Sequence, residues 1–410
     1  MIANADSIRI PLPDGVVQCV VTSPPYWGLR AYSGEQERVW GGDADCEHEW
    51  GAEQRGRQHG RNDTNDPTST NFGGWGNWDG VTGDSAGNFC QRCGAWRGGL
   101  GLEPTPELFI EHMVQVFREV RRVMRDDAVA WVNMGDCFND KQLVMMPHRL
   151  ALALQADGWW VRSDAVWAKP NPMPESLSGW RWEQCRVKAT DDWQPCTGCP
   201  KCAANDGLVL RRGSWRPTNS HEYVFMLAKS STYFSDGEAV REAHTRTWDS
   251  KTLGGSLSSG KHKLHGRMVT QERKTPEPNP AGRNLRDVWN IATQPFKGAH
   301  YATFPTALAQ RCVLASTSRH ACAECGAPHV RVVEQKSHRP SCGCGAGVRP
   351  CIVLDPFCGS GTVGQVCREL PHRRDFVGLD LSFEYLQEQA LVRSERRTPP
   401  SALAELLMFA

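Results

Sequence analysis

The chain has 410 residues, enough for one large enzyme domain with insertions or for two ordinary domains. Its hydrophobic content of 40% can supply a buried core, while its net charge of +1 does not by itself indicate a nucleic-acid-binding protein. It contains no apolar run of the roughly 20 residues that a bilayer requires, and its first residues lack the apolar centre of a signal peptide. These features exclude a membrane protein and predict a cytoplasmic one.

The first predicted strand is a short apolar, β-branched run at Val16–Thr22. It ends at Ser23-Pro24-Pro25, because proline cannot donate a hydrogen bond to a sheet. Residues 41–101 are polar, rich in Gly, Asn and Trp, and show no convincing periodicity. We interpret them as an insertion.

A helix is predicted after this insertion. Thr105 is placed to cap it, Pro106 suits its first position and Glu107 its first turn. Apolar residues recur at helical spacing and form a buried face: Phe109, Met113, Val116, Phe117, Val120 and Met124. Another apolar strand follows at Ala128–Asn133. A strand, a helix and a strand in succession predict an α/β fold, with a parallel sheet and helices on both faces.

The middle of the chain combines an insertion, a strand and a basic segment. Residues 185–202 form the second insertion, and His221–Ala228 has the pattern of a strand. Between Arg241 and Arg286 there are ten Lys/Arg and four Asp/Glu, in a stretch rich in Gly, Ser and Pro. Such a segment can neutralise phosphates, and a solvated linker is the alternative interpretation.

The C-terminal part returns to alternating helices and strands. The patterns predict a helix within Tyr301–Ser316 that opens at Pro305, a cysteine insertion at Cys322–Cys344, a strand at Cys351–Asp355, a helix at Gly359–Leu370 and a strand at Asp375–Asp380.

A glycine-rich motif, LDPFCGSGT at Leu354–Thr362, connects the strand to the helix in this part. Gly359 and Gly361 allow a tight turn and a close approach of the backbone to a ligand, next to free N–H groups at the start of the helix. Asp380 ends the following strand, where its carboxylate can accept hydrogen bonds from both hydroxyls of a ribose. Together with Asp355, these residues predict a cofactor site.

Seventeen cysteines are an unusual number. An odd count without a secretion signal argues against a disulfide framework, and short C-x-x-C pairs indicate metal ligation. Three groups have the spacing of zinc ligands: Cys46, His48, Cys90 and Cys93; Cys185, Cys196, Cys199 and Cys202; and Cys322, Cys325, Cys342 and Cys344. Each group leaves no open position for a catalytic water, so we expect structural zinc. Cys358 and the other cysteines are expected to be small core residues.

The heptapeptide VTSPPYW at Val21–Trp27 resembles the catalytic motif of the DNA amino-methyltransferases, in which Asp, Asn or Ser precedes Pro-Pro and an aromatic residue. The resemblance implies S-adenosylmethionine as the cofactor. Ala5-Asp6 and His300–Pro305 resemble further cofactor blocks of this family, and Trp215–Thr218 with His221-Glu222 resembles the block before its target-recognition region. The implied catalytic residues are Ser23, Pro24, Pro25 and Tyr26, and the implied cofactor-binding residues are Asp6, Thr303, Phe304, Pro305, Asp355, Phe357, Gly359, Ser360, Gly361, Thr362 and Asp380.

The catalytic motif precedes the cofactor motif, which is similar to the permuted β group of this family. The implied fold is the Rossmann-like fold of S-adenosylmethionine-dependent methyltransferases with zinc-binding insertions, and both motifs should lie at the carboxyl ends of adjacent strands. The implied division of the chain is a catalytic half at 1–42 and 99–235, zinc-binding insertions at 43–98 and 185–202, a target-recognition segment at 236–286, and a cofactor-binding half at 287–400 with a zinc insertion at 320–346.

The resemblance also implies how the catalytic motif acts. An exocyclic amine is a poor nucleophile because its lone pair is delocalised into the ring, so acceptors for its protons activate it. The Ser23 hydroxyl and the Pro24 carbonyl are suitable acceptors. The base must leave the duplex to reach them, and Tyr26 is placed to stack on it. Because serine at this position accompanies cytosine N4 methylation in the family, the expected activity is methylation of cytosine N4 in double-stranded DNA.

Other activities stay open. Adenine N6 methylation is the nearest alternative, although it usually accompanies Asp or Asn at the position of Ser23. A non-catalytic, zinc-containing DNA-binding protein would explain the cysteines and the basic segment without requiring Ser-Pro-Pro-Tyr. Methylation of a protein glutamine also uses Pro-Pro-Tyr, but after Asn and after the cofactor block. The resemblance suggests a bacterial or phage modification enzyme and leaves the DNA recognition sequence, a partner nuclease and the oligomeric state open.

Overall fold

The computed structural model describes most of the chain. The described residues are 1–28, 36–51, 85–139, 141–172, 178–189, 192–244, 261–264, 267–270, 279–294 and 303–394. His300–Ala302 of the expected cofactor block, much of the expected target-recognition segment and the middle of the first insertion lie outside these ranges.

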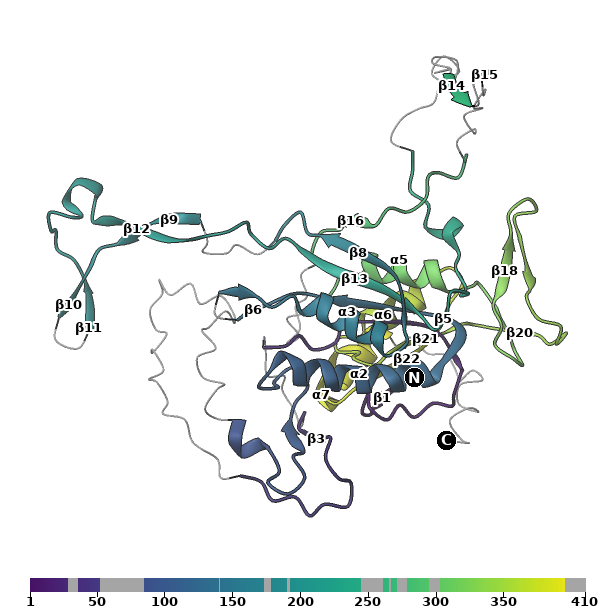
Figure 1. Ribbon diagram of the computed structural model, residues 1–410, viewed down its shortest axis with the longest axis horizontal. Helices are drawn as coiled ribbons and strands as arrows, with labels where there is room; N and C mark the ends of the chain where they lie inside the picture. Colours follow the sequence, from purple (N-terminus) through teal and green to yellow (C-terminus); the bar gives the residue numbers. More distant parts are fainter. Residues whose placement is uncertain are drawn as a thin grey trace.

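An eight-stranded sheet forms the centre of the molecule (Figure 1). Its order is β1 (Ile2–Asn4), β22 (Asp375–Asp380), β21 (Ile352–Asp355), β2 (Val17–Thr22), β5 (Met124–Met134), β13 (His221–Ala228), β8 (Trp160–Ala168) and β16 (Val288–Asn290). The expectation of a parallel sheet was wrong for one strand, because β13 runs antiparallel to both β5 and β8. This strand follows β8 through a long hairpin connection, which returns the chain without a crossover helix.

Helices cover both faces of the sheet, as predicted. Helices α2 (Pro106–Val123) and α3 (Met146–Ala156) pack on one face, and α5 (Thr306–Ser316) and α6 (Thr362–Glu369) pack on the other. In β2, Val20 belongs to the first core, whereas its neighbours Cys19 and Val21 belong to the second. All six residues of β2 are buried, because a strand between two helical layers has no solvent-exposed side.

The predicted ends of the helices agree with the structure in two cases and differ in one. Thr105 caps α2 by accepting a hydrogen bond from the Leu108 backbone N–H, and α5 begins directly after Pro305. Helix α6 begins at Thr362 and not at Gly359, since the residues between them form a turn in which Gly361 has φ +74°. After β22 the chain continues through the short helical turns α7 (Phe383–Tyr385), η4 (Leu386–Ala390) and α8 (Leu391–Ser394).

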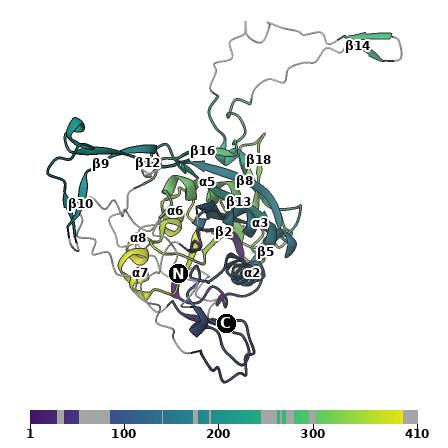
Figure 2. The ribbon, with the colours of Figure 1, turned by 60° about the vertical axis from the view of Figure 1, so that its left-hand side comes forward.

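Pairs of short strands extend from this core. They are β3 (Arg38–Trp40) with β4 (Trp96–Gly98), β6 (Phe138–Asn139) with β7 (Gln142–Leu143), β9 (Ser178–Gln184) with β12 (Leu208–Trp215), β10 (Arg186–Ala189) with β11 (Asp192–Pro195), β14 (Lys261–Leu264) with β15 (Arg267–Thr270), β17 (Ala321–Cys322) with β20 (Val348–Arg349), and β18 (His329–Val332) with β19 (Ser337–Pro340). Single 3-10 turns lie at η1 (Ser85–Asn88), η2 (Ala203–Asn205) and η3 (Gly237–Val240). Figure 2 shows β9, β10 and β12 reaching away from the central sheet.

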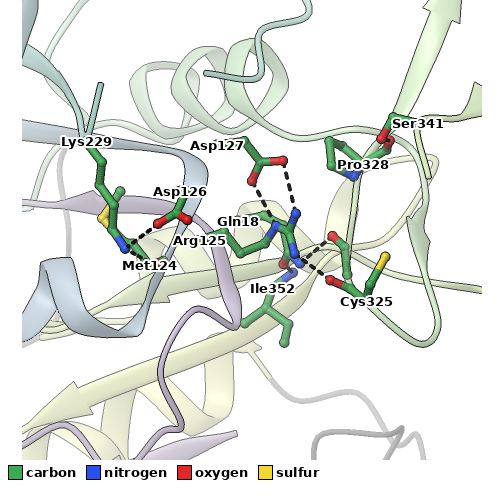
Figure 3. A network of polar contacts seen from close by, with 11 residues as sticks. Gln18, Met124, Arg125, Asp126, Asp127, Lys229, Cys325, Pro328, Ser341 and Ile352 are labelled. Carbon is green, nitrogen blue, oxygen red and sulfur yellow. Dashed lines mark hydrogen bonds and ion pairs between the residues drawn. The ribbon is translucent and has the colours of Figure 1, made fainter. Parts of the chain in front are cut away.

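The third cysteine insertion is fixed to one end of the sheet (Figure 3). Gln18, near the start of β2, donates to the Gly326 carbonyl and accepts from the Ile352 backbone N–H at the start of β21. Arg125, at the start of β5, pairs with Asp127 and also donates to the Cys325 carbonyl. These contacts place the insertion at the amino ends of the parallel strands. Among the described residues, no helix is long and apolar enough to cross a membrane.

Candidate active site

The serine-proline motif and the glycine-rich motif meet at the carboxyl ends of β2 and β21. These two strands pair in parallel, with Val20 opposite Leu354. Thr22 Oγ1 consequently reaches Asp355 Oδ1 and donates a buried hydrogen bond of 2.7 Å. Two motifs 333 residues apart in the chain are therefore joined in space, which confirms the expected adjacency of their strands.

A pocket of about 980 Å³, counting the space at its mouth, opens at this junction. Most of the expected site residues line it: Asp6, Ser23, Pro24, Pro25, Tyr26, Thr303, Phe304, Asp355, Phe357, Gly359, Ser360, Thr362 and Asp380. Pro305 and Gly361, which directly precede α5 and α6, are not part of the lining. Gln36, Trp40 and Tyr385 also line the pocket, and no local sequence pattern had indicated them.

Asp380 organises the glycine-rich turn. Its Oδ2 accepts from the Gly359 N–H at 2.8 Å, and its Oδ1 accepts from the Ser382 N–H at 2.8 Å. Glycine is required at Gly361, because a Cβ there would lie 2.8 Å from the Ala390 Cα in a backbone conformation that L side chains rarely adopt. Since a carboxylate has about four acceptor positions, Asp380 keeps capacity for donors from a ligand.

Burial changes the electrostatics of this wall. Burial raises the pKa of Asp355 to about 7, against the opposing effect of the hydrogen bond from Thr22, and it also raises the pKa of Asp380. Neither carboxyl makes an ion pair with a described cationic side chain. A buried and a partly buried carboxyl without a cation fit a ligand that carries hydroxyl donors and a positive charge. S-adenosylmethionine has both, in its ribose and its sulfonium group, so the residues present fit this cofactor.

Asp6 lies on the same pocket but has partners of its own. Its Oδ2 forms an ion pair of 2.8 Å with Arg38 Nε, and its Oδ1 accepts from the Ile8 N–H at 3.1 Å. Arg38 begins β3, so this contact joins the N-terminal strand region to the strand that leads into the first insertion. Asp6 therefore lines the pocket, as expected, and its ion pair with Arg38 also holds β3 against the N-terminal segment.

The catalytic motif is held by a polar network behind Tyr26. Ser23 Oγ donates to the Tyr26 hydroxyl at 3.2 Å, and this hydroxyl donates to Glu222 Oε2 at 2.8 Å. Asn133 Nδ2 donates to Tyr26 at 2.9 Å and to Glu222 at 2.7 Å, and Lys169 forms an ion pair with the same carboxylate. The Tyr26 hydroxyl is thereby fixed, and its ring forms part of the pocket wall.

Sequence reasoning did not assign roles to Asn133, Lys169 or Glu222. Glu222 had appeared only within a family-like block, and Asn133 only as the end of an apolar strand. The available signal was polar residues at the pocket end of the sheet: Asn133 lies near the carboxyl end of β5, and Glu222 lies near the amino end of the antiparallel strand β13. The pairing of β13 with β5 was not predicted, so the two residues could not be placed together.

Trp27 packs behind the motif and does not line the pocket. It is 5% exposed, and its indole N–H donates to the Glu103 carbonyl at 2.8 Å. The Glu103 carboxylate contacts His112 Nδ1 at 2.9 Å in the core, and the His112 ring stacks on Trp40 at 4.5 Å. These contacts connect the catalytic motif to α2 and to the strand that enters the first insertion.

All three expected cysteine groups assemble in space. Within each group, the four ligand atoms lie within 4.8 Å of one another, so each group could hold a metal ion such as zinc. Backbone N–H groups favour thiolates in each group: hydrogen bonds from the Asp43 and Ala95 backbone lower the pKa of Cys93, one from Lys201 lowers the pKa of Cys199 to about 7, and one from Cys325 lowers the pKa of Cys322 to about 7. The groups contain none of the pocket-lining residues, which agrees with a structural role.

Comparison with known proteins shows which family shares the two motifs that meet at the pocket. A family model for N6 and N4 methyltransferases, described as DNA methylase, matches residues 17–391. The type II methyltransferase M.Cfr9I of Citrobacter freundii is 30% identical, over 93% of this chain and 83% of that protein. The type II methyltransferase M.SmaI of Serratia marcescens is 27% identical, over 91% and 83%.

Solved structures include a similar chain as well. The cytosine-N4-specific PvuII DNA methyltransferase is 12% identical, over 99% of this chain and 90% of that chain, with a TM-score of 0.48. The family match spans nearly the whole chain, and the pocket unites the two motifs of that family. The chain therefore belongs to the N6/N4 DNA methylase family, whose members are S-adenosylmethionine-dependent DNA methyltransferases.

Proposed function

We propose that this DNA methyltransferase modifies the N4 amine of cytosine, as a type II modification enzyme. One observation carries the proposal: the Ser23 hydroxyl donates a hydrogen bond to the Tyr26 hydroxyl, which donates a hydrogen bond to Glu222. The lone pairs of Ser23 Oγ are then available as acceptors at the pocket. An exocyclic amine has protons to donate to such an acceptor. Serine at this position, in place of Asp or Asn, favours cytosine over adenine.

Each part of the pocket has a role in this reaction. Asp380 and the glycine-rich turn would bind the cofactor, together with Asp6 and Phe304. S-adenosylmethionine supplies an electrophilic methyl group when it is bound. Ser23 Oγ and the Pro24 carbonyl would orient a base that has left the duplex, so that its amine lone pair faces the methyl group.

The network behind Tyr26 also offers a path for the proton that the amine releases. Ser23 Oγ can accept this proton while its own proton moves to the Tyr26 oxygen and that of Tyr26 moves to Glu222. The hydroxyls of Ser23 and Tyr26 then each carry one proton, as they did before, and the Glu222 carboxylate has gained one. The ion pair with Lys169 holds Glu222 in place for this transfer.

The remaining assignments belong to the same proposal. Double-stranded DNA is the partner, the enzyme works in the cytoplasm, and residues 236–286 contribute to target recognition. The catalytic and cofactor-binding halves are those expected from the sequence, at 1–42 with 99–235 and at 287–400. The expected insertions at 43–98, 185–202 and 320–346 carry structural zinc.

Mass spectrometry of nucleosides from DNA methylated by the protein tests the proposal. We expect N4-methylcytosine, with product formation strongly reduced in Ser23→Ala and unchanged in Ser337→Ala, a serine of β19 outside the pocket. N6-methyladenine as the sole product would refute the base assignment and leave the methyltransferase fold and mechanism standing. Absence of any methylated base, with no retained S-adenosylmethionine, would favour a non-catalytic DNA-binding protein.

A further inference from the structure

The strands β9 and β12 form a two-stranded ribbon that leaves the sheet beside the pocket. The ribbon connects β8 to β13, and the last backbone hydrogen bond at its base runs from the Lys169 N–H to the Ser220 carbonyl at 2.7 Å. Lys169 and Glu222 lie at this base, and both belong to the network that holds Tyr26. Figures 1 and 2 show the ribbon extending from here, well beyond the helical layers.

The base of the ribbon is at the pocket end of the sheet. Strand β8 is antiparallel to β13, which is antiparallel to β5, so β8 points the same way as β5 and β2. The pocket lies at the carboxyl ends of β2 and β21, and the ribbon begins at the carboxyl end of β8. A long substrate that places one base in the pocket therefore passes this side of the molecule.

One face of the ribbon is apolar and basic. Trp182 pairs with Leu210 and Trp180 pairs with Arg212, and directly opposed residues of an antiparallel pair share a face. Trp180 is 57% exposed, Trp182 53% and Leu210 47%. The Arg212 guanidinium lies 5.8 Å from the centre of the Trp180 ring. We name these four residues the tryptophan face.

The opposite face has a different character. Glu183 forms ion pairs there with Arg181 on its own strand and with Arg211 on β12, the latter at 3.6 Å. The charges of this face are thus partly satisfied within the ribbon. A two-stranded ribbon has no second layer, so it cannot bury the tryptophan face by itself.

Charge and side-chain type indicate what would cover the tryptophan face. Residues 178–216 contain seven Lys/Arg and four Asp/Glu, against a nearly neutral chain. Arginine beside exposed indole rings suits a partner that offers phosphates next to apolar surface, because guanidinium binds phosphate and indole buries apolar groups while its N–H can donate a hydrogen bond. Duplex DNA offers phosphates along both strands and thymine methyl groups in its major groove, and this groove, about 12 Å wide, admits a two-stranded β-ribbon.

We propose that the tryptophan face is a DNA-contacting surface that holds the duplex next to the base pocket. It acts in addition to the expected recognition segment at 236–286. Cys185 directly follows β9, and its group with Cys196, Cys199 and Cys202 would fix the far end of the ribbon when it holds a metal ion. The inference rests on the proposed action on duplex DNA but not on which base is methylated.

Substitutions on the tryptophan face test the inference in the full-length, zinc-loaded protein. Trp182→Ala should raise the Kd for a short duplex by about 10- to 150-fold, the effect of losing one buried large apolar side chain, and Trp182→Phe should restore most of the affinity. Arg212→Ala should also weaken binding and lower the slope of log Kd against log salt concentration by about 1. Fluorescence anisotropy with labelled DNA measures both effects.

Matched controls separate this surface from general changes. Trp160→Ala removes an indole that is 47% exposed at the opposite end of β8, and Arg339→Ala removes an exposed arginine of β19. Both should keep the wild-type Kd for DNA. In steady-state assays, Trp182→Ala should raise KM for DNA while KM for S-adenosylmethionine and kcat at saturating DNA stay within about twofold.

Two results would overturn the inference. The first is a wild-type Kd and KM for DNA in both Trp182→Ala and Arg212→Ala, with circular dichroism and zinc content unchanged. The second is loss of self-association in these variants without any loss of DNA affinity, measured by sedimentation, which would assign the face to a second copy of the chain. Ribbon-dependent DNA binding by a protein that methylates no base would instead refute the proposed function and leave the inference standing.

Discussion

Replacing Thr22 with valine isolates the electrostatics of the pocket wall. Valine keeps the shape of threonine but removes the hydroxyl that donates to Asp355 at 2.7 Å. Burial raises the pKa of this carboxyl to about 7, and the Thr22 hydrogen bond opposes that increase. Because a hydrogen bond to a charged group contributes about 1.5–3 kcal/mol, its loss should raise the pKa of Asp355 by about 1 to 2 more.

The sign of the pH effect follows from the two pKa values of Asp355. The ordinary value is 3.8 and the folded value is about 7, so the unfolded chain ionises first as the pH rises. The free protein therefore loses roughly 4 kcal/mol of stability between about pH 4 and pH 7. Folding favours the protonated form of Asp355, whereas binding of a cationic ligand in the pocket favours its carboxylate form. Affinity for S-adenosylmethionine should increase with pH and level off above about pH 7.

Calorimetric titration with S-adenosylmethionine between about pH 5.5 and 9 measures this dependence. In Thr22→Val the rise in affinity should continue to a higher pH than in the wild type. Thr232→Val, an exposed threonine after β13, should follow the wild-type curve. If folded Thr22→Val shows the wild-type midpoint, the hydrogen bond does not control the ionisation of Asp355 and the reasoning fails.

Three further predictions concern the cofactor, the target amine and the metal. Asp380→Ala should weaken S-adenosylmethionine binding by about 10- to 150-fold, and unchanged affinity in calorimetry would remove Asp380 from the site. Ser23→Ala should keep cofactor affinity but lower kcat roughly 10- to 100-fold. Tyr26→Phe should lower kcat and keep DNA affinity. Tyr26→Ala should lower both kcat and DNA affinity, because the ring that stacks on the base is lost. Elemental analysis should find two or three equivalents of zinc, and a metal-free protein that folds and methylates normally would contradict the structural role of zinc.

Patterns of neighbouring residues in the sequence predicted the bounds of two buried strands and the start of helix α2. The strands His221–Ala228 and Asp375–Asp380 have the expected bounds, because continuous apolar runs with polar ends mark buried strands. Helix α2 begins where Thr105 and Pro106 require it. The direction of β13 was not predictable in this way, since an apolar run is the same whether its neighbours are parallel or antiparallel.

The site was predictable where its residues belong to continuous motifs. Ser23, Asp355 and Asp380 line the pocket, as their positions at strand ends indicated. Trp40 ends the short strand before the first insertion and Tyr385 ends a helical turn, and only the packing of the whole chain brings them to the pocket. The partners of Tyr26 were missed for the same reason, because they lie on strands whose order in the sheet was unknown.

The junction between Thr22 and Asp355 explains why a permuted order of motifs does not disturb the chemistry. Parallel pairing of β2 with β21 depends on the two strands and not on the length of chain between them. The intervening residues supply α2, β5, β8 and β13, which place Asn133, Lys169 and Glu222 behind the catalytic motif. The catalytic end of the sheet is thus assembled from strands distributed through the whole sequence. A change that shifts the register of β13 against β5 should impair methyl transfer even where every pocket-lining residue is retained, because Glu222 would no longer face the Tyr26 hydroxyl.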